Sequence, residues 1–592
     1  MVARLLAFGF ACCSCLALAF SGEPAPVSAE TSDPTTATSE LIDAEIAKVW
    51  QRDGVKPASR ALDEEFLRRV YLDTVGLPPT RAEARAFLDD ERLDKRERLV
   101  DALLADPRFG RHLADLWMPI LRERGNDLGE LGVSAGEVLA VWLARQFNAD
   151  VGFDKVISEL VTAEGAISKN PASAYYGLMG FPARSPNMAG LTSKHFAGIQ
   201  IQCAECHDHP YEESWTQQTF KGMASFFTGI EIKADFEVQP VDPRVETVPI
   251  PPRKLIEAYA NSPELPPEAI NRVEDLLTYD QPQLIGDKPV KTRDTKMWRK
   301  LFAGWLTGAG NATARHYLVN RFWSFLFGTG LLNPVDDFNS LNEASHPELL
   351  AKLGDWFARS YSVKKLYRAI LNSRTYQLSG RGGEGGERWH FNHAPVRQLT
   401  AEQFFGALFT LRDGEAMLKP FARQTVSQYE RLRQFKTIQD MQGDKPKDDY
   451  GAKFDDELLK TYEAWIGEMG TEWQLRRGLA AQYAALASDD ERMQSDTFTL
   501  SIDQALSILN GEVTRRLSDS RNGSLIYAIM RDHTETAERV ENLYLAILSR
   551  RPTLGEKRRA LEFLAELKQP EQVGLEDLFY ALVSSTEFAT NH

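Results

Sequence analysis

The stretch Ile199-Gln-Ile-Gln-Cys203-Ala-Glu-Cys206-His207-Asp-His209-Pro210 contains the only two cysteines of the chain after residue 15. Cys-x-x-Cys-His is the pattern through which c-type haem is attached, because two thiols bond to the vinyl groups and the histidine supplies an axial nitrogen to iron. On one helical turn the two thiols fall on the same face. The sequence therefore predicts covalent haem c on Cys203 and Cys206, with His207 as the proximal ligand of the iron.

The same residues are compatible with two other kinds of site. A disulfide between Cys203 and Cys206 needs no metal ion. Cys203, Cys206 and His209 also recur at intervals of three residues and could bind zinc or copper, with His195 as a fourth ligand. Haem is the leading interpretation, and the small metal ion and the disulfide are its alternatives.

The motif supplies only one axial ligand of a haem iron. His209 lies two residues after His207 and so points roughly 200° away around a helix, which places it away from the same iron. His195 and Met188 are candidates for the sixth ligand, as are Met179 and Met223, and spacing singles out none of them. A filled sixth position favours electron transfer, whereas an open one allows peroxide or another small ligand to bind.

The first residues have the composition of an export signal. Arg4 precedes an apolar stretch from Leu5 to Phe20, which is too short for a comfortable membrane span, and Ala17-Leu18-Ala19 offers a cleavage site. Residues 1–20 are therefore predicted to be a signal peptide, and residues 21–40, rich in Pro, Ser, Thr and Ala, a flexible tether. The protein is expected in the periplasm, at the cell surface or secreted, where disulfides also form.

Length and charge limit the classes of protein to consider. A chain of 592 residues suggests about two to four domains. The net charge of −15 is spread along the sequence without a long basic run, which argues against nucleic acid as a partner. No membrane span is expected after the signal peptide is removed.

Periodicity and capping signals predict a mainly α fold. Residues 63–76 read as a helix with an acidic first turn and a glycine stop, Thr80 and Glu83 as a capping box, and Asp106-Pro107 as a helix start. His112, on the apolar side of that last helix, is expected to be a buried residue of the protein core. We expect two helical domains, at residues 41–232 and 293–592, joined by a Pro-rich connection at 233–292 with minor β structure near Phe236-Glu-Val-Gln-Pro240.

The order of motifs along the chain resembles the planctomycete-type cytochrome-c-like proteins. In these, a domain of unknown function with Cys-x-x-Cys-His is followed by a second, planctomycete-specific domain of unknown function. The matching stretches are Phe66-Leu-Arg-Arg-Val-Tyr-Leu-Asp-Thr-Val-Gly-Leu-Pro-Pro-Thr80, Gln202-Cys-Ala-Glu-Cys-His-Asp-His-Pro210, Val319-Asn-Arg-Phe-Trp-Ser-Phe-Leu-Phe-Gly-Thr-Gly-Leu331, Asp336-Asp-Phe338, Ser345-His-Pro-Glu-Leu-Leu350, Asn372-Ser-Arg-Thr-Tyr376 and Glu587-Phe-Ala-Thr-Asn-His592. The resemblance implies export and haem, and it implies no particular reaction.

The second domain contains one stretch rich in polar groups, Asp336-Asp337-Phe-Asn339-Ser-Leu-Asn342-Glu343-Ala-Ser345-His346-Pro347-Glu348. Its carboxylates and amides could bind calcium, and Asp337 with His346 could form an acid/base pair. The leading interpretation is structural, because Ser345 and Glu348 have the spacing of a capping box and Pro347 suits a first helical turn.

The leading functional hypothesis is an exported haem protein that passes electrons to a redox partner protein or a small electron carrier, with a peroxidase-like variant. A carbohydrate-processing or carbohydrate-binding envelope protein, in which the cysteine motif only braces the fold, is the alternative from another class, and a structural envelope protein is the third. No phosphate-binding loop, nucleophile elbow or zinc-hydrolase motif is present. The sequence therefore names no substrate, and it leaves open whether the protein is an enzyme.

Overall fold

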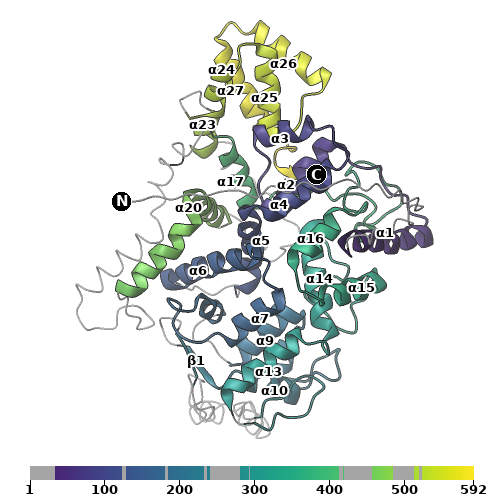
Figure 1. The fold of residues 1–592 in the computed structure, drawn as a ribbon, viewed down its shortest axis with the longest axis vertical. Helices are drawn as coiled ribbons and strands as arrows, with labels where there is room; N and C mark the ends of the chain where they lie inside the picture. Colours follow the sequence, from purple (N-terminus) through teal and green to yellow (C-terminus); the bar gives the residue numbers. More distant parts are fainter. Residues whose placement is uncertain are drawn as a thin grey trace, which may run out of the picture.

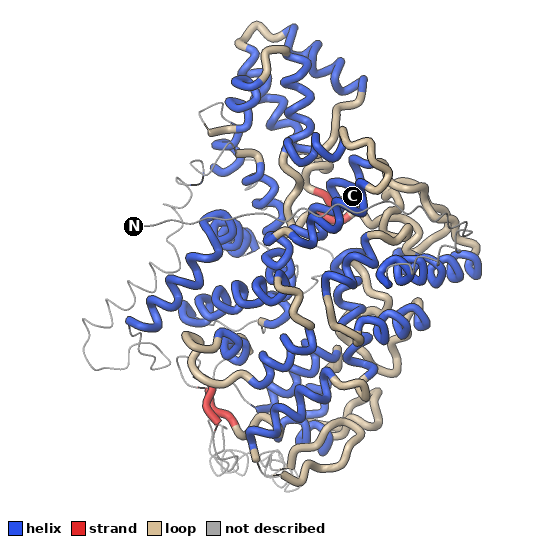
Figure 2. The backbone as a smooth tube through the Cα atoms, viewed as in Figure 1, coloured by secondary structure: helices blue, strands red, loops and turns tan. Residues whose placement is uncertain are grey.

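The computed structural model describes residues 34–122, 129–179, 185–232, 237–240, 281–292, 294–412, 418, 456–484, 512–518 and 523–592. In this part of the chain helices dominate, and the sheets are two antiparallel pairs of short strands (Figure 2). β1 (Ile230–Ile232) pairs with β2 (Val238–Pro240), and β3 (Arg397–Gln398) pairs with β4 (Thr590–Asn591). The prediction of a mainly α fold with minor β structure is confirmed. The expected signal peptide lies outside the described residues, and so do residues 241–280 of the connection.

The helices before the connection are α1 (Pro34–Asp53), α2 (Asp63–Val75), α3 (Arg81–Leu88), α4 (Lys95–Ala105), α5 (Pro107–Leu121), α6 (Gly129–Asn148), α7 (Phe153–Thr162), η1 (Pro171–Ser173), α8 (Ala174–Gly177), α9 (Ser185–Ala197), η2 (Ile201–Glu205) and α10 (Gln217–Ser225), where η marks a 3₁₀ helix. They include α9 and α10, on which the turn with the cysteine motif packs.

The helices after the connection lie in different parts of the molecule, the first of them near the bottom of Figure 1 and the last at the top. They are α13 (Thr295–Thr307), α14 (Ala312–Phe327), α15 (Pro347–Phe357), α16 (Val363–Leu371), η3 (Arg388–His390), α17 (Ala401–Thr410), α20 (Asp456–Ala484), α23 (Glu512–Ser518), α24 (Leu525–Asp532), α25 (Thr536–Leu548), α26 (Leu554–Glu566) and α27 (Glu571–Val583).

The local signals in the sequence place helix ends correctly. α2 starts with three acidic residues and ends at Gly76, whose φ of 70° is the left-handed conformation that glycine adopts without strain. Thr80 and Glu83 form the expected capping box of α3, and Asp106 caps α5. His112 of α5 is buried in the core as expected, and burial lowers the pKa of its imidazole to about 4.

The expected tether is wrong for residues 34–40, because α1 begins at Pro34. Small polar side chains in its first turns are buried, and the Ser39 hydroxyl donates a hydrogen bond to the Ala369 carbonyl oxygen at 2.7 Å. α1 packs on α15 and α16, so the helix is stabilised by distant parts of the chain. Composition alone could not predict this helix, because a segment of low helix propensity can still be helical when it packs against the rest of the protein.

Side chains from both sides of the connection pack into one hydrophobic cluster. Trp117 of α5 lies at its centre, with ring centroids 4.9 Å from Phe153 and 5.7 Å from Phe322. α13 packs on α7, and α14 packs on α9, the helix that leads into the cysteine motif. The two halves of the sequence therefore support the motif together.

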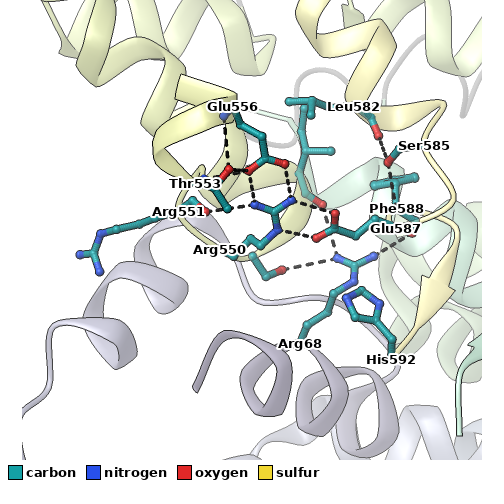
Figure 3. Close-up of polar contacts among 12 residues, drawn as sticks. Arg68, Arg550, Arg551, Thr553, Glu556, Leu582, Ser585, Glu587, Phe588 and His592 are labelled. Atoms are coloured by element: carbon teal, nitrogen blue, oxygen red, sulfur yellow. Dashed lines mark hydrogen bonds and ion pairs between the residues drawn. The ribbon is translucent and has the colours of Figure 1, made fainter. Parts of the chain in front are cut away.

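A second hydrophobic cluster joins α17 to α24, α25 and α27, at the upper end of Figure 1. Figure 3 shows the polar contacts beneath it, in which the Arg550 guanidinium bonds to Glu556 and Glu587. Arg68 of α2 is fully buried there and donates to the Phe588 carbonyl oxygen at 2.7 Å. These contacts fasten the C-terminal helices to α2.

Candidate functional site

The cysteine motif lies on the surface in a turn that is anchored from beneath. η2 carries Cys203, and Cys206 follows as its C-terminal cap residue. In a 3₁₀ helix, side chains three residues apart are eclipsed, so the spacing of the two cysteines directs both thiols to the same side. Ile201 and Ala204 are buried, whereas Cys203, Cys206 and His207 are exposed. The structure therefore buries Ala204 between the two cysteines and presents the side chains of Cys203, Cys206 and His207 to solvent.

The imidazole of His207 is oriented by its neighbour. Its Nδ1 lies 2.7 Å from the Asp208 carbonyl oxygen, and a carbonyl can only accept, so Nδ1 carries the proton and donates it. In the neutral ring this leaves Nε2 with a free lone pair. Asp208 is itself held in place, because its carboxylate accepts from the Gln217 amide at the start of α10 at 2.9 Å. Histidines that bind metals usually have this arrangement, in which the second nitrogen donates to a carbonyl or carboxylate.

His209 has a different role in the same turn. Its Nδ1 accepts from the backbone amides of Glu212 at 3.2 Å and Tyr211 at 3.4 Å. Its ring packs edge-on against Trp215 at 4.9 Å between centroids, and its amide donates to the Trp215 carbonyl oxygen. His209 therefore closes the loop after the motif, and its Nδ1 is occupied.

The candidates for the sixth ligand lie in the core. Met188, Met179 and Met223 are at most 1% exposed. His195 is 3% exposed, and its Nδ1 lies 3.2 Å from the Tyr175 hydroxyl. Burial lowers the pKa of His195 to about 3, and the positive charges of nearby Lys194 and Arg321 act in the same direction. His195 is thus a neutral core residue in this structure, and none of the four is exposed as the motif is.

Neither the disulfide nor the small-metal site that the motif could form is present in the described residues. Both thiols are free, so no disulfide joins Cys203 and Cys206. Across the described ranges, no three His, Cys, Asp or Glu side chains are arranged to hold a metal ion, which covers the expected set with His209 and His195. Within residues 336–348, too, no three carboxylate or imidazole side chains are arranged to hold a metal ion.

The polar stretch of the second half lies directly against the cysteine motif. The Phe338 amide donates to the Gly198 carbonyl oxygen at 2.7 Å, and the Gln200 side chain donates to the Asp336 carbonyl oxygen at 3.2 Å. The Ser340 hydroxyl donates to the Tyr211 carbonyl oxygen at 3.3 Å. Residues 336–342, which we call the flanking loop, therefore contact the chain on both sides of the motif.

Two interpretations of this stretch need correction. The N-cap of α15 is His346 and no side chain caps it, so Ser345 and Glu348 form no capping box, although Pro347 does begin the helix. The Ser345 hydroxyl instead donates to the Leu331 carbonyl oxygen at 2.9 Å, because the loop folds back on the turn after α14.

The expected acid/base pair is not formed either. Both the carbonyl and the carboxylate of Asp337 accept from the Asn342 side chain, at 2.8 and 3.1 Å. His346 is buried, its Nδ1 lies 3.0 Å from the Ser345 hydroxyl oxygen, and burial lowers its pKa to about 4. The charged groups that act on it are those of His390, Arg52, Asp53 and Glu45. The fold thus gives Asp337 and His346 separate partners.

Comparison with protein families matches both halves of the chain. Residues 41–232 match PSCyt2, a protein of unknown function (DUF1549), and residues 298–564 match PSD1, a protein of unknown function (DUF1553). This chain contains a DUF1549 domain followed by a DUF1553 domain. The pair is the planctomycete-type arrangement that the sequence motifs resemble, and neither description assigns a function. Comparisons with curated proteins and with solved structures found no match. Of the helices that the structure describes, none has the length and apolar character to span a membrane.

The sequence identified the cysteine motif but missed its neighbours. The flanking loop belongs to the DUF1553 domain and is separated from the motif by more than a hundred residues, so no local spacing relates the two. Tyr211 belongs to the aromatic run that follows the motif in the sequence, whereas the exposed Leu341 of the flanking loop carried no signal. Only the folded chain brings these groups together.

Proposed function

We propose that this protein is an exported c-type haem protein that transfers electrons, with Cys203 and Cys206 as covalent anchors and His207 as the proximal ligand of the iron. The observation that carries the proposal is the presentation of the motif. Two free, exposed thiols lie in 3₁₀ register, and the neighbouring imidazole donates Nδ1–H to a backbone carbonyl, which leaves Nε2 for a metal.

The residues of the motif fit this cofactor chemically. Each thiol would add across a vinyl group, with sulfur bonding to one carbon and hydrogen to the other, and such a reaction requires that both sulfurs be accessible. A disulfide would make no use of the adjacent His207, whose Nδ1–H bond to Asp208 is typical of an imidazole that ligates metal through Nε2. Bound haem would supply one-electron redox chemistry.

A peroxidase-like activity is a second candidate, and it rests on the burial of the expected sixth ligands. His195 and Met188 are packed inside the DUF1549 domain and have no solvent-facing position in this structure. The sixth position of an iron on His207 would then be open to a small ligand. Cyanide or carbon monoxide binding to the purified protein, followed by its spectrum, distinguishes an open position from a filled one.

The test is to produce the full chain in a host with haem-ligation machinery and to measure its intact mass and pyridine haemochrome spectrum. The wild type should carry one covalent haem. Cys203→Ala and Cys206→Ala should each leave a single thioether, with the absorption band shifted toward that of haem with a free vinyl group, and the double variant should carry none. His533→Ala, in the distant C-terminal helices, is the matched histidine control for His207→Ala. A correctly matured wild type that is colourless and has the mass of the bare polypeptide would refute the proposal.

A further inference from the structure

The flanking loop of the DUF1553 domain is held firmly against the motif. Gly198 has a φ of +65°, and a Cβ atom there would lie 2.5 Å from the Tyr317 ring and 2.9 Å from the Phe338 ring. The chain before the motif therefore fits closely between an aromatic side chain of α14 and one of the flanking loop. On the other side of the motif, Glu212 accepts from the Ser340 amide.

Asp336 of the flanking loop pairs with one cation of each domain. The Asp336 carboxylate lies 3.6 Å from the Lys194 ammonium group of α9 and 3.4 Å from the Arg321 guanidinium of α14. These ion pairs join the loop to the helix that leads into the motif and to the helix beneath it. The position of residues 336–340 relative to Cys203 and Cys206 is therefore set by contacts at both ends of the motif.

Two large apolar side chains project into solvent where the loop meets the motif. Tyr211, four positions after His207, is 60% exposed, and Leu341, directly after Ser340, is 62% exposed. The hydrogen bond from the Ser340 hydroxyl to the Tyr211 carbonyl oxygen places the backbone next to Leu341 against the backbone of Tyr211. Each comes from a different domain, and each leaves more than half of its surface open to solvent.

We propose that Tyr211 and Leu341 form an apolar shelf that covers an edge of the haem, so that the DUF1553 domain completes a cofactor site begun by the DUF1549 domain. This inference rests on the proposed function. Cys203 and Cys206 would place the porphyrin over the same exposed surface, and an apolar macrocycle on that surface is stabilised by apolar neighbours that remove it from water. The shelf would thereby shield the haem from water, which the exposed residues of the motif do not do.

The shelf is tested on the haem-loaded full chain with Tyr211→Ser and Leu341→Ser. Both variants should bind haem as fully as the wild type, because neither residue is an anchor or a ligand. Greater exposure of the haem stabilises its more highly charged oxidised form, so we expect a lower midpoint potential in each variant. The Soret band should also become more sensitive to added cosolvent. Leu93→Ser, at a fully exposed leucine elsewhere in the DUF1549 domain, is the matched control and should leave both measurements unchanged.

The outcomes separate the two proposals. A wild type without haem overturns the proposed function and the shelf together. A haem-loaded Leu341→Ser protein with the wild-type potential and cosolvent response overturns the shelf alone. The double variant should show less than the sum of the two single effects, because both side chains cover the same edge. Tyr211→Phe and Leu341→Met, which keep the apolar surface, should retain the wild-type potential, and a shift in either would contradict the proposal.

Discussion

The Arg550 network offers a quantitative test of how the C-terminal helices are held (Figure 3). Arg550 donates to both oxygens of Glu556 at 2.8 Å and to those of Glu587 at 2.5 and 2.9 Å. Arg550→Met keeps most of the aliphatic stem and removes all of these bonds. The two glutamates would then lose the cation that holds them.

The pKa of Glu556 gives the size of the effect. Hydrogen bonds from Arg550, and after them from Thr553, lower it from 4.5 to about 2, which corresponds to about 3.5 kcal/mol at about 1.4 kcal/mol per pKa unit. About a fifth of each side chain reaches solvent, and this screening reduces the expected loss for Arg550→Met to about 2 kcal/mol at pH 7. Because the folded-state pKa is depressed, the stabilisation is complete above pH 4.5 and is lost as the pH falls toward 2.

The assay is urea unfolding followed by far-UV circular dichroism at pH 7 and pH 3. The wild type should lose about 1 kcal/mol more than Arg550→Met between these pH values, since the variant lacks the largest of the effects that lower the Glu556 pKa. Arg551→Met is the matched control, because Arg551 pairs with Asp89 where the two side chains are 40% and 56% exposed, and such pairs contribute about 1 kcal/mol or less. Equal losses for the two variants at pH 7 would refute this reasoning.

Three further substitutions test other parts of the structure. Gly198→Ala should lower the free energy of unfolding by about 2–3 kcal/mol, from a left-handed φ and a steric clash, whereas Gly54→Ala, with a φ of +66° and open space around it, should cost only about 1 kcal/mol in the same urea titration. His195→Gln should weaken the pH dependence of the free energy of unfolding. His195 has a folded-state pKa of about 3, so between pH 6.5 and 5 only the unfolded state takes up a proton, which costs the wild type about 2 kcal/mol of stability. Equal slopes of unfolding free energy against pH for variant and wild type would exclude this. Asp73→Ala should lower the free energy of unfolding by about 3–5 kcal/mol, since this buried carboxylate accepts hydrogen bonds from Arg397, Tyr376 and Asn591. A loss under about 1 kcal/mol, measured by calorimetry, would contradict that role.

The sequence by itself determined the helical class, several helix ends and the identity of the reactive motif. Helix caps such as Thr80 with Glu83 act over three or four residues, so their signals are read directly from adjacent positions. The same is true of the spacing that relates Cys203, Cys206 and His207. These features depend on local hydrogen bonds and on periodicity, which a linear sequence displays.

The tertiary structure alone decided what surrounds the motif. It buried His195 beside Tyr175, turned His207 so that Nδ1 faces the Asp208 carbonyl, and brought the flanking loop to the motif across more than a hundred residues. It also ordered residues 34–40 by packing α1 against α16, which composition could not anticipate. These contacts depend on which apolar surfaces pack together when the chain folds. That packing involves segments far apart in the sequence, so it leaves no pattern at neighbouring positions.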